Sequence, residues 1–87
     1  MSKPILFFAN LCSDTTPFVA ELKRLNVGYE EVEIMSSMVN FKRFLKLRDR
    51  HPAFEQAKEN GYIGIPALLL ADEQVVLDIN QLKDIFG

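Results

Sequence analysis

The sequence predicts an α/β domain in which two parallel strands, joined by a helix, share a sheet with a β-hairpin. Three observations support this fold class. An apolar run at residues 5–8 stops just before a helix-start pattern, and residues 29–34 alternate like a strand after that helix. Two more strand-like runs, at 67–71 and 75–77, are separated by only three residues. Strands joined by a helix must be parallel with a right-handed crossover, whereas strands joined by a short turn are antiparallel.

The composition is that of one soluble globular domain. Of the 87 residues, 48% are hydrophobic and 25% are charged, which is enough for one core and far from the composition of disorder. We therefore expect a single domain over residues 1–87. The apolar stretch at residues 5–9 is too short for a signal sequence or a membrane span, so we expect no membrane association.

Charge and cysteine content exclude further classes of protein. A formal net charge of −2 argues against nucleic acid as the main partner. The single cysteine, Cys12, cannot form an internal disulfide, so the chain is not a disulfide-stapled secreted scaffold. We therefore expect a reducing compartment, and hence the cytoplasm, as its location.

The first strand is expected at residues 4–9, and its consecutive apolar side chains are typical of a strand that is covered on both faces. The start of the following helix has two solutions, because a proline fits only the first turn of a helix. The N-cap is Ser13 or Asp14, or else it is Thr16 with Pro17 as the first helical residue.

The first helix and the second strand should each bury one face. Apolar residues recur at helical spacing in the helix, at Phe18, Leu22 and Leu25. Gly28 is placed to end this helix in a left-handed turn. The strand at residues 29–34 should then point Val32 and Ile34 inward.

Two helices in series are expected next. Ser36 or Ser37 can cap the first of them, and this helix should end before Pro52. Its apolar face is formed by residues at helical spacing, namely Met38, Phe41, Phe44 and Leu45. Pro52 can begin a second, short helix that closes at residues 60–61.

A hairpin and a last helix complete the predicted domain. Pro66 precedes an apolar strand at 67–71, and residues 72–74 form the turn to a returning strand at 75–77. Asp78 and Gln81 fit a capping box at the start of the last helix. The apolar stripe of that helix consists of Leu82, Ile85 and Phe86.

Cys12 is the residue through which any chemistry of this chain would pass. It follows the first strand and precedes a helix, where unpaired backbone N–H groups favour a thiolate over a thiol. If Thr16 is the cap, the thiol lies one turn too early to feel the helix terminus strongly. Alternatively, Cys12 is a small buried hydrophobe, because free cysteines are among the most buried residues. The residue pattern leaves both interpretations open.

The order of elements, with Cys12 after the first strand and Pro66 opening the third, resembles the glutaredoxin branch of the thioredoxin fold over essentially the whole chain. Cys12-Ser13-Asp14-Thr15 corresponds to the family's C-x-x-C or C-x-x-S motif, and Gly64-Ile65-Pro66 to its cis-proline segment. The resemblance implies a four-stranded mixed sheet in the order 2-1-3-4 with helices on both faces, and a cis Ile65–Pro66 bond. It also implies that Ile65 offers its backbone to glutathione or an extended peptide.

The motif implies chemistry with one thiol. Thr15 stands where the second cysteine of the motif would be, so Cys12 would take glutathione from a mixed disulfide and be released by a second thiol. Glutathione is then a co-substrate, and glutathione or a disulfide-bearing protein is the expected partner. Thr15 is the candidate to donate its hydroxyl to the Cys12 sulfur, and Ser13 or Thr16 could help. Ser13 is also expected to contact the substrate. Asp78 and Asn80 occupy the region where the family grips the glutathione amine.

Several positions depart from the family pattern. Ala9 replaces the lysine that many glutaredoxins carry three residues before the cysteine, Asp14 adds a negative charge near the thiol, and the Gly-Gly before the last helix is absent. The motif is also not the C-G-F-S sequence of the iron–sulfur branch, so we expect no cluster. With one cysteine and one histidine far apart in sequence, we expect no metal site.

Other side chains allow two interpretations each. One predicted helix carries five of the ten basic residues, as an anion-receiving face or as a solvated face: Lys42, Arg43, Lys46, Arg48 and Arg50. Tyr62 either contacts a bound peptide or packs as a rim aromatic. His51 precedes a proline in a connector, and we expect it to be exposed and without a role.

The sequence thus supports two functional hypotheses and leaves the oligomeric state open. In the first, the chain is a glutaredoxin-like thiol–disulfide oxidoreductase that acts through Cys12 in cell redox homeostasis. In the second, Cys12 is inert and the domain is a thioredoxin-fold module that binds a peptide or protein at its cis-proline edge.

Overall fold

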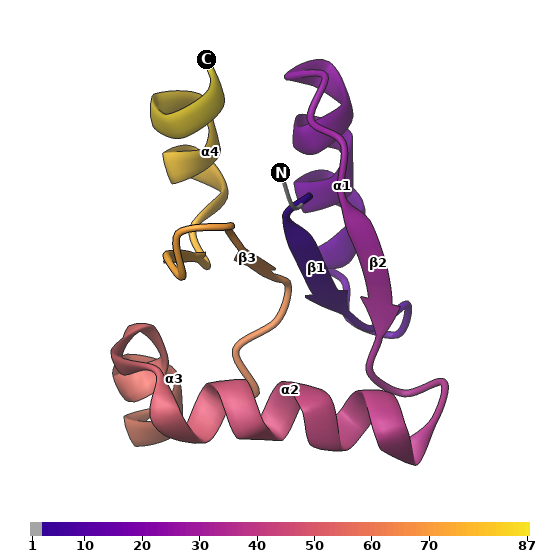
Figure 1. Ribbon diagram of the computed structural model, residues 1–87, viewed down its shortest axis with the longest axis vertical. Helices are drawn as coiled ribbons and strands as arrows, with labels where there is room; N and C mark the ends of the chain where they lie inside the picture. Colours follow the sequence, from indigo (N-terminus) through magenta and orange to yellow (C-terminus); the bar gives the residue numbers. More distant parts are fainter. Residues whose placement is uncertain (1–2) are drawn as a thin grey trace.

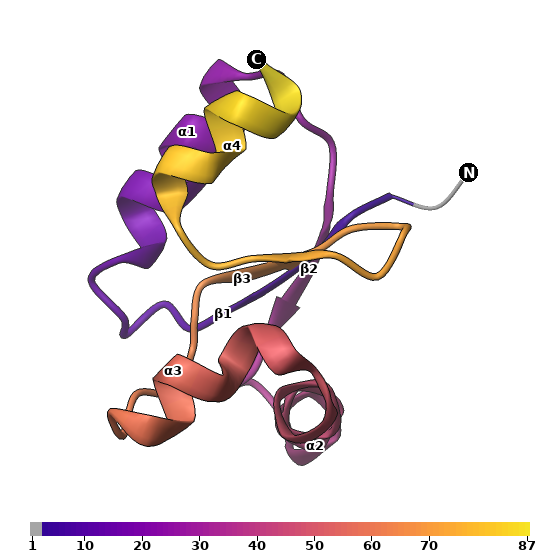
Figure 2. The same ribbon diagram turned by 90° about the vertical axis from the view of Figure 1, so that its left-hand side faces the viewer.

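The computed structural model describes residues 3–87, and its elements follow the predicted order. They are β1 (Ile5–Phe8), α1 (Thr15–Arg24), β2 (Glu30–Glu33), α2 (Met38–Arg50), the 3-10 helix η1 (Pro52–Phe54), α3 (Glu55–Glu59), β3 (Ala67–Leu69), β4 (Val75–Val76) and α4 (Ile79–Phe86). The sheet separates two helical layers, with α1 and α4 on one face and α2 and α3 on the other (Figures 1 and 2). The predicted α/β class and its helices on both faces are confirmed.

The sheet has the order β2-β1-β3-β4, which confirms the order 2-1-3-4. β1 is parallel to β2, whereas β3 is antiparallel to both β1 and β4. Phe7 of β1 lies opposite Val32 of β2 and Ala67 of β3. The parallel pair and the hairpin that the connection lengths predicted are therefore both present.

β1 is covered on both faces, as its continuous apolar run predicted. Leu6 and Phe8 pack in one cluster with Phe18 of α1, and Phe7 packs in the other with Phe44 of α2. Successive side chains of a strand point to opposite faces, so a central strand between two helical layers must be apolar at every position. Val32 of β2 is also buried, as expected.

α1 begins at Thr15 with Asp14 at the N-cap position, so the alternative with Thr16 as the cap is wrong. Asp14 caps without a side-chain hydrogen bond, and two backbone turns lead into the helix instead. In these turns the Cys12 N–H donates to the carbonyl of Ala9 at 3.0 Å, and the Thr15 N–H donates to the carbonyl of Cys12 at 3.1 Å. Cys12 therefore lies in the loop three residues ahead of the helix.

The end of α1 differs from the prediction. Asn26, with φ of 59°, occupies the left-handed position that we assigned to Gly28. Asparagine tolerates this conformation, and there the N–H of Val27 donates to the carbonyl of Leu22. The helix thus ends earlier than the glycine indicated.

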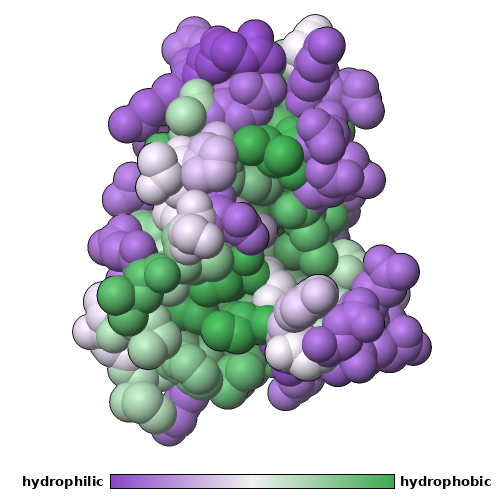
Figure 3. Space-filling model, turned by 180° about the vertical axis from the view of Figure 1, so that it is seen from behind, coloured by the Kyte–Doolittle hydropathy of each residue, from purple (hydrophilic) through white to green (hydrophobic). Residues whose placement is uncertain are grey.

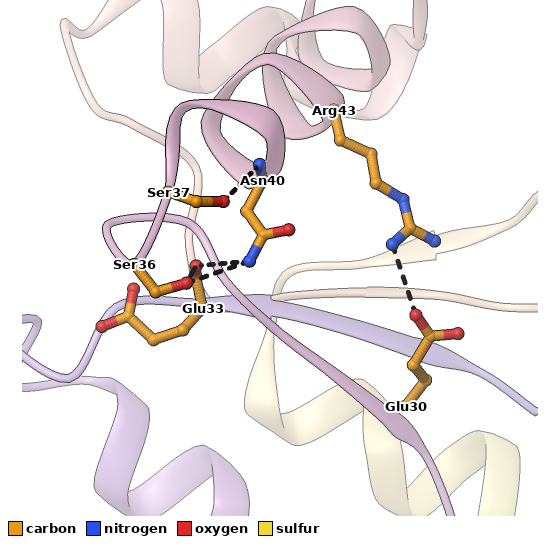
Figure 4. A network of polar contacts seen from close by, with 6 residues as sticks. All are labelled: Glu30, Glu33, Ser36, Ser37, Asn40 and Arg43. Atoms are coloured by element: carbon orange, nitrogen blue, oxygen red, sulfur yellow. Dashed lines mark hydrogen bonds and ion pairs between the residues drawn. The ribbon is translucent and has the colours of Figure 1, made fainter.

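α2 is capped by Ser37, whose hydroxyl accepts a hydrogen bond from the N–H of Asn40 at 3.1 Å (Figure 4). The helix ends at Arg50, before Pro52, as predicted. Met38 was expected on its apolar face but is 67% exposed, because the buried residues of the helix lie further along, at Phe44 and Leu47.

α4 begins after Asp78, whose carboxylate accepts the N–H of Asn80 at 2.9 Å. Leu82 is fully buried, whereas Ile85 of the expected apolar stripe is 38% exposed. Across residues 3–87, no helix is long and apolar enough to cross a membrane.

Candidate functional site

An open groove of about 810 Å³ lies between the loop that carries Cys12, the end of α3 and the segment that leads into β3. The loop and α3 lie on the same side of the molecule, at the left in Figure 2. The groove is lined by Ala9, Leu11, Cys12, Asp14, Met35, Gln56, Ala57, Asn60, Gly61, Tyr62, Ile63, Gly64, Ile65, Pro66 and Leu77. Most of these residues are apolar, so the groove suits a ligand with apolar groups.

Cys12 forms part of the groove wall. Its side chain is half-buried and packs against the edge of the core on the α2 side of the sheet. The Cys12 Sγ lies 3.9 Å from the carbonyl oxygen of Ile65, 53 residues further along the chain. The fold thus brings together the two segments that the resemblance singled out.

Thr15 does not donate a hydrogen bond to the Cys12 sulfur, in contrast to our expectation. Its hydroxyl is buried and donates to the carbonyl of Ala9 at 2.8 Å. A threonine hydroxyl has one proton to donate, so Thr15 fixes the loop rather than the thiol. Ser13 is exposed and does not line the groove.

The Ile65–Pro66 peptide bond is cis, as the resemblance implied. The ladder between β1 and β3 ends at Phe7 and Ala67, because the next acceptor on β1, the Ala9 carbonyl, is occupied by Cys12 and Thr15. Within the described part of the chain, the N–H and carbonyl of Ile65 therefore have no backbone hydrogen-bond partner. The N–H thus remains available at the groove, and the carbonyl faces the Cys12 thiol at 3.9 Å.

Arg48 of α2 holds the segment that precedes the cis bond. Its Nε donates to the carbonyl of Ile63 and its Nη2 to the carbonyl of Tyr62, each at 2.8 Å. The Tyr62 side chain is 67% exposed at the rim of the groove, so it is not a packed aromatic. Gly64 has φ of 95°, and a Cβ there would lie 2.8 Å from the Phe54 ring. No residue pattern around Arg48 indicated this contact.

Asp78 and Asn80 do not line the groove, although we predicted that they bind the glutathione amine. Both are exposed, and one carboxylate oxygen of Asp78 is already used to cap α4. Leu77, the residue before Asp78, is the one that reaches the groove from this end of the sheet.

Met35 reaches the groove from the turn between β2 and α2. Glu33 fixes this turn, since its carboxylate accepts the N–H of Met35 at 2.6 Å. The Asn40 side chain donates to the Glu33 carbonyl and to the Ser36 hydroxyl, at 3.1 and 3.0 Å (Figure 4). Met35, Leu11 and Ile63 were not predicted as site residues, because nothing local in the sequence distinguishes them from core residues.

Two of the basic residues of α2, Arg43 and Arg50, form ion pairs away from the Cys12 groove. Arg43 lies 3.3 Å from Glu30 at the β2 edge, and Arg50 lies 3.7 Å from Glu73 of the hairpin. The groove lining contains none of the basic side chains of α2. The anion-receiving interpretation of this helix thus finds no support in the groove.

We expected His51 to be an exposed connector residue without a role, but the structure gives its side chain two hydrogen-bond partners. It is half-buried, and its Nδ1 accepts the N–H of Ala53 at 3.0 Å, while its Nε2 lies 2.7 Å from the carbonyl of Glu73. The first contact makes Nδ1 an acceptor, so Nε2 carries the ring hydrogen and donates a hydrogen bond to the backbone carbonyl of Glu73. His51 therefore caps η1 and ties it to the hairpin. Among residues 3–87, no group of acidic, histidine and cysteine side chains is arranged to hold a metal.

Comparison with known proteins supports the fold more than the chemistry. No family model matches the chain. A protein of Haemophilus influenzae, described as an uncharacterized protein, is 62% identical over 86 residues, which cover 99% of this chain and all of that protein. Among solved structures, a glutathione transferase homologue from Sulfitobacter, crystallised with bound glutathione, matches with a TM-score of 0.55 and 17% identity. The match covers 99% of this chain but only 36% of the transferase homologue.

Proposed function

We propose that this chain catalyses thiol–disulfide exchange through Cys12. The chain belongs to one family with the Haemophilus influenzae protein and has a thioredoxin-like fold. One observation carries the proposal. The Cys12 sulfur opens onto a groove and lies 3.9 Å from the carbonyl of Ile65, whose backbone groups have no backbone partner in the described chain. An accessible thiol and a peptide edge without a backbone partner thus share one site.

The exchange needs only the Cys12 thiol in the protein, with glutathione as the reductant. The Cys12 thiolate attacks one sulfur of a protein–glutathione mixed disulfide, that disulfide breaks, and the other sulfur leaves as a thiolate. Glutathione thiolates then displace the group bound to Cys12, so that the reduced protein, glutathione disulfide and the Cys12 thiolate are the final products. Each step breaks one S–S bond and forms one, so electrons balance over the cycle.

The free backbone of Ile65 supports the binding half of this proposal. An extended peptide can pair with its N–H and carbonyl, which adds a short strand beside β3 and brings a disulfide next to Cys12. Glutathione enters the proposal as co-substrate by extension from the Sulfitobacter homologue, which was crystallised with it. A reducing compartment such as the cytoplasm would supply this thiol.

The exposed apolar rim favours a second candidate function. Four apolar side chains at the groove are more than half exposed, namely Leu11, Met35, Tyr62 and Ile63. Such a rim is also suited to a redox-inactive module that binds a partner protein.

Exchange kinetics distinguish the two functions. We expect the wild-type protein to consume a peptide–glutathione mixed disulfide with transient formation of a covalent adduct on Cys12, measured by mass spectrometry after acid quenching. Cys12→Ser should form no adduct and should leave the substrate at its uncatalysed rate. If folded wild-type protein and Cys12→Ser behave alike, the domain is a binding module.

A further inference from the structure

We propose that the groove selects the protein part of a mixed disulfide rather than its glutathione part. The occupant is an extended segment with apolar side chains on both sides of its cysteine and a basic residue on the side that faces Asp14. This inference rests on the proposed exchange at Cys12 for its chemistry, but its recognition argument depends on the groove alone.

The apolar surface around Cys12 is the first observation behind this inference. The rim side chains Leu11, Met35, Tyr62 and Ile63 are 88%, 56%, 67% and 56% exposed. Seen from behind, hydrophobic residues gather at the lower left and centre of the molecule, towards the start of α2, whereas the lower right, on the side of α3, is hydrophilic (Figure 3). A contiguous apolar area on a small domain marks an interaction site more often than single exposed residues do.

The apolar surface extends beyond what a tripeptide would cover. A second hollow of about 260 Å³ shares Met35, Tyr62, Ile63 and Ile65 with the groove and continues to Phe41 and Leu45 of α2. An extended chain advances about 3.3 Å per residue and alternates its side chains between two sides. A segment that pairs with Ile65 can therefore place apolar side chains in both hollows.

Charge is the second observation, and it disfavours glutathione as the part that binds. Glutathione carries two carboxylates, which proteins bind with cationic side chains or free N–H groups. Asp14 is the one charged residue in the lining of the Cys12 groove over residues 3–87. Arg48 borders the second hollow, but two of its nitrogens already donate to backbone carbonyls. The groove is thus complementary to a neutral or cationic segment.

This arrangement decides which sulfur is attacked. With the protein segment in the groove, its cysteine sulfur faces Cys12, and the Cys12 thiolate forms a disulfide with the protein. The old disulfide breaks, and glutathione leaves to solvent as a thiolate. A glutathione thiolate then attacks the Cys12 sulfur and expels the protein thiolate, and a second glutathione thiolate attacks the glutathione sulfur on Cys12, which releases the Cys12 thiolate and forms glutathione disulfide. If glutathione occupied the groove instead, Cys12 would become glutathionylated and the protein would leave.

The test uses a blocked hexapeptide whose cysteine is flanked by leucine and valine, with a lysine next to the leucine, as its mixed disulfide with glutathione. After short incubation and acid quenching, mass spectrometry counts the two adducts on Cys12. We expect the peptide adduct to exceed the glutathione adduct at least tenfold. Replacing the peptide lysine by glutamate should lower this ratio several-fold, and Asp14→Lys in the protein should reverse that preference.

Two protein variants serve as a matched pair. Leu11→Asp should lower the yield of peptide adduct several-fold, whereas Ile85→Asp, at an exposed apolar position on α4, should not change it. A predominant glutathione adduct, or equal yields from the two variants, overturns the inference but leaves exchange at Cys12 intact. Formation of neither adduct overturns the proposed exchange itself.

A binding measurement separates these failures. Cys12→Ser protein and the same peptide with serine for cysteine cannot exchange, so NMR titration reports recognition alone. We expect shifts around Ile63 and Ile65 and tighter binding than for S-methylglutathione. Equal or weaker peptide binding overturns the inference, as does a concentration-dependent dimer in sedimentation that buries the same residues.

Discussion

The two faces of the sheet are both packed, and the Cys12 groove opens at the edge of the face that α2 and α3 cover. On the first face, α1 and α4 cover the strands, and Leu6, Phe18 and Leu82 lie in one buried cluster. On the second face, Phe44 packs between Phe7 and Phe54, with both ring centroids at 5.7 Å. The second core is as buried as the first at its centre, yet its edge opens beside Cys12.

The difference comes from how the chain returns to the sheet. α1 and α4, of 10 and 8 residues, cover the first face of the sheet (Figure 2). After α3, the chain reaches β3 through an irregular segment at residues 61–66, where Gly61 and Gly64 both have positive φ. Irregular backbone leaves hydrogen-bonding groups unpaired, so the site forms where the regular packing ends.

Truncating one aromatic on each face tests whether the groove depends on one core only. Phe18→Ala and Phe54→Ala should each lower the free energy of unfolding by about 3–5 kcal/mol, because both rings are buried. Denaturant titration measures this loss. The milder Phe18→Leu and Phe54→Leu variants, which keep the protein folded, should then differ at the thiol. Only Phe54→Leu, beneath Gly64, should change the alkylation rate of Cys12, and a matching change in Phe18→Leu would contradict the separation of the faces.

Alanine substitutions at two glycines of the groove, Gly64 and Gly61, should differ in their effect on stability. Gly64→Ala adds a methyl group 2.8 Å from the Phe54 ring at a φ of 95°, so we expect a loss of about 2–4 kcal/mol from strain and overpacking. Gly61→Ala has φ of 74° but no atom within 4 Å of its Cβ, and should lose only about 1 kcal/mol. Thermal unfolding of both variants separates the steric contribution from the backbone contribution. Equal losses would mean that Phe54 does not constrain the segment.

Arg48 should matter for the groove more than for stability. Arg48→Gln removes two hydrogen bonds to the Tyr62 and Ile63 carbonyls, and we expect a loss of about 1 kcal/mol together with weaker peptide binding. The control is Arg43→Gln, which breaks an exposed ion pair with Glu30 and should cost less than about 1 kcal/mol with no change in binding. Calorimetry and the NMR titration report the two effects, and similar binding by both variants would remove Arg48 from the site.

The smallest expected effect is on the pH dependence of stability, through Tyr29 on the face that α1 and α4 cover. Burial raises the pKa of Tyr29, which packs against the cluster on the α1 side, above its usual value of 10.0. The folded protein therefore keeps the phenol proton where the unfolded chain loses it, and stability should fall as pH rises above about 10. Tyr29→Phe should reduce this fall in urea titrations between pH 9 and 11. An unchanged pH dependence would show that Tyr29 is not desolvated.

Local patterns in the sequence were sufficient for most of the fold. The continuous apolar run of β1, the proline after α2 and the short polar connection between β3 and β4 each reflect short-range preferences or strand periodicity. Errors appeared where two local solutions compete. The α1 end used Asn26 instead of Gly28, since both residues tolerate a left-handed turn and the packing of Val27 and Leu22 decides between them.

The site was predicted only in part. Cys12, Tyr62, Ile65 and Pro66 do line one groove, but Asp78 and Asn80 lie outside it and Thr15 bonds to Ala9. A short polar side chain near a cysteine in sequence has several acceptors within reach. Which one it bonds depends on loop geometry that the residue pattern does not specify.

The amino-acid sequence by itself determined the order of strands and helices, the single thiol and the proline that opens the third strand, because these follow from periodicity, backbone preferences and composition. Only the tertiary structure decided that Leu11, Met35 and Ile63 meet around that thiol and that Ile65 keeps its backbone free. The physical reason is that an exposed apolar rim and a buried core use the same residue types. Long-range packing alone determines which of these residues remain in contact with water.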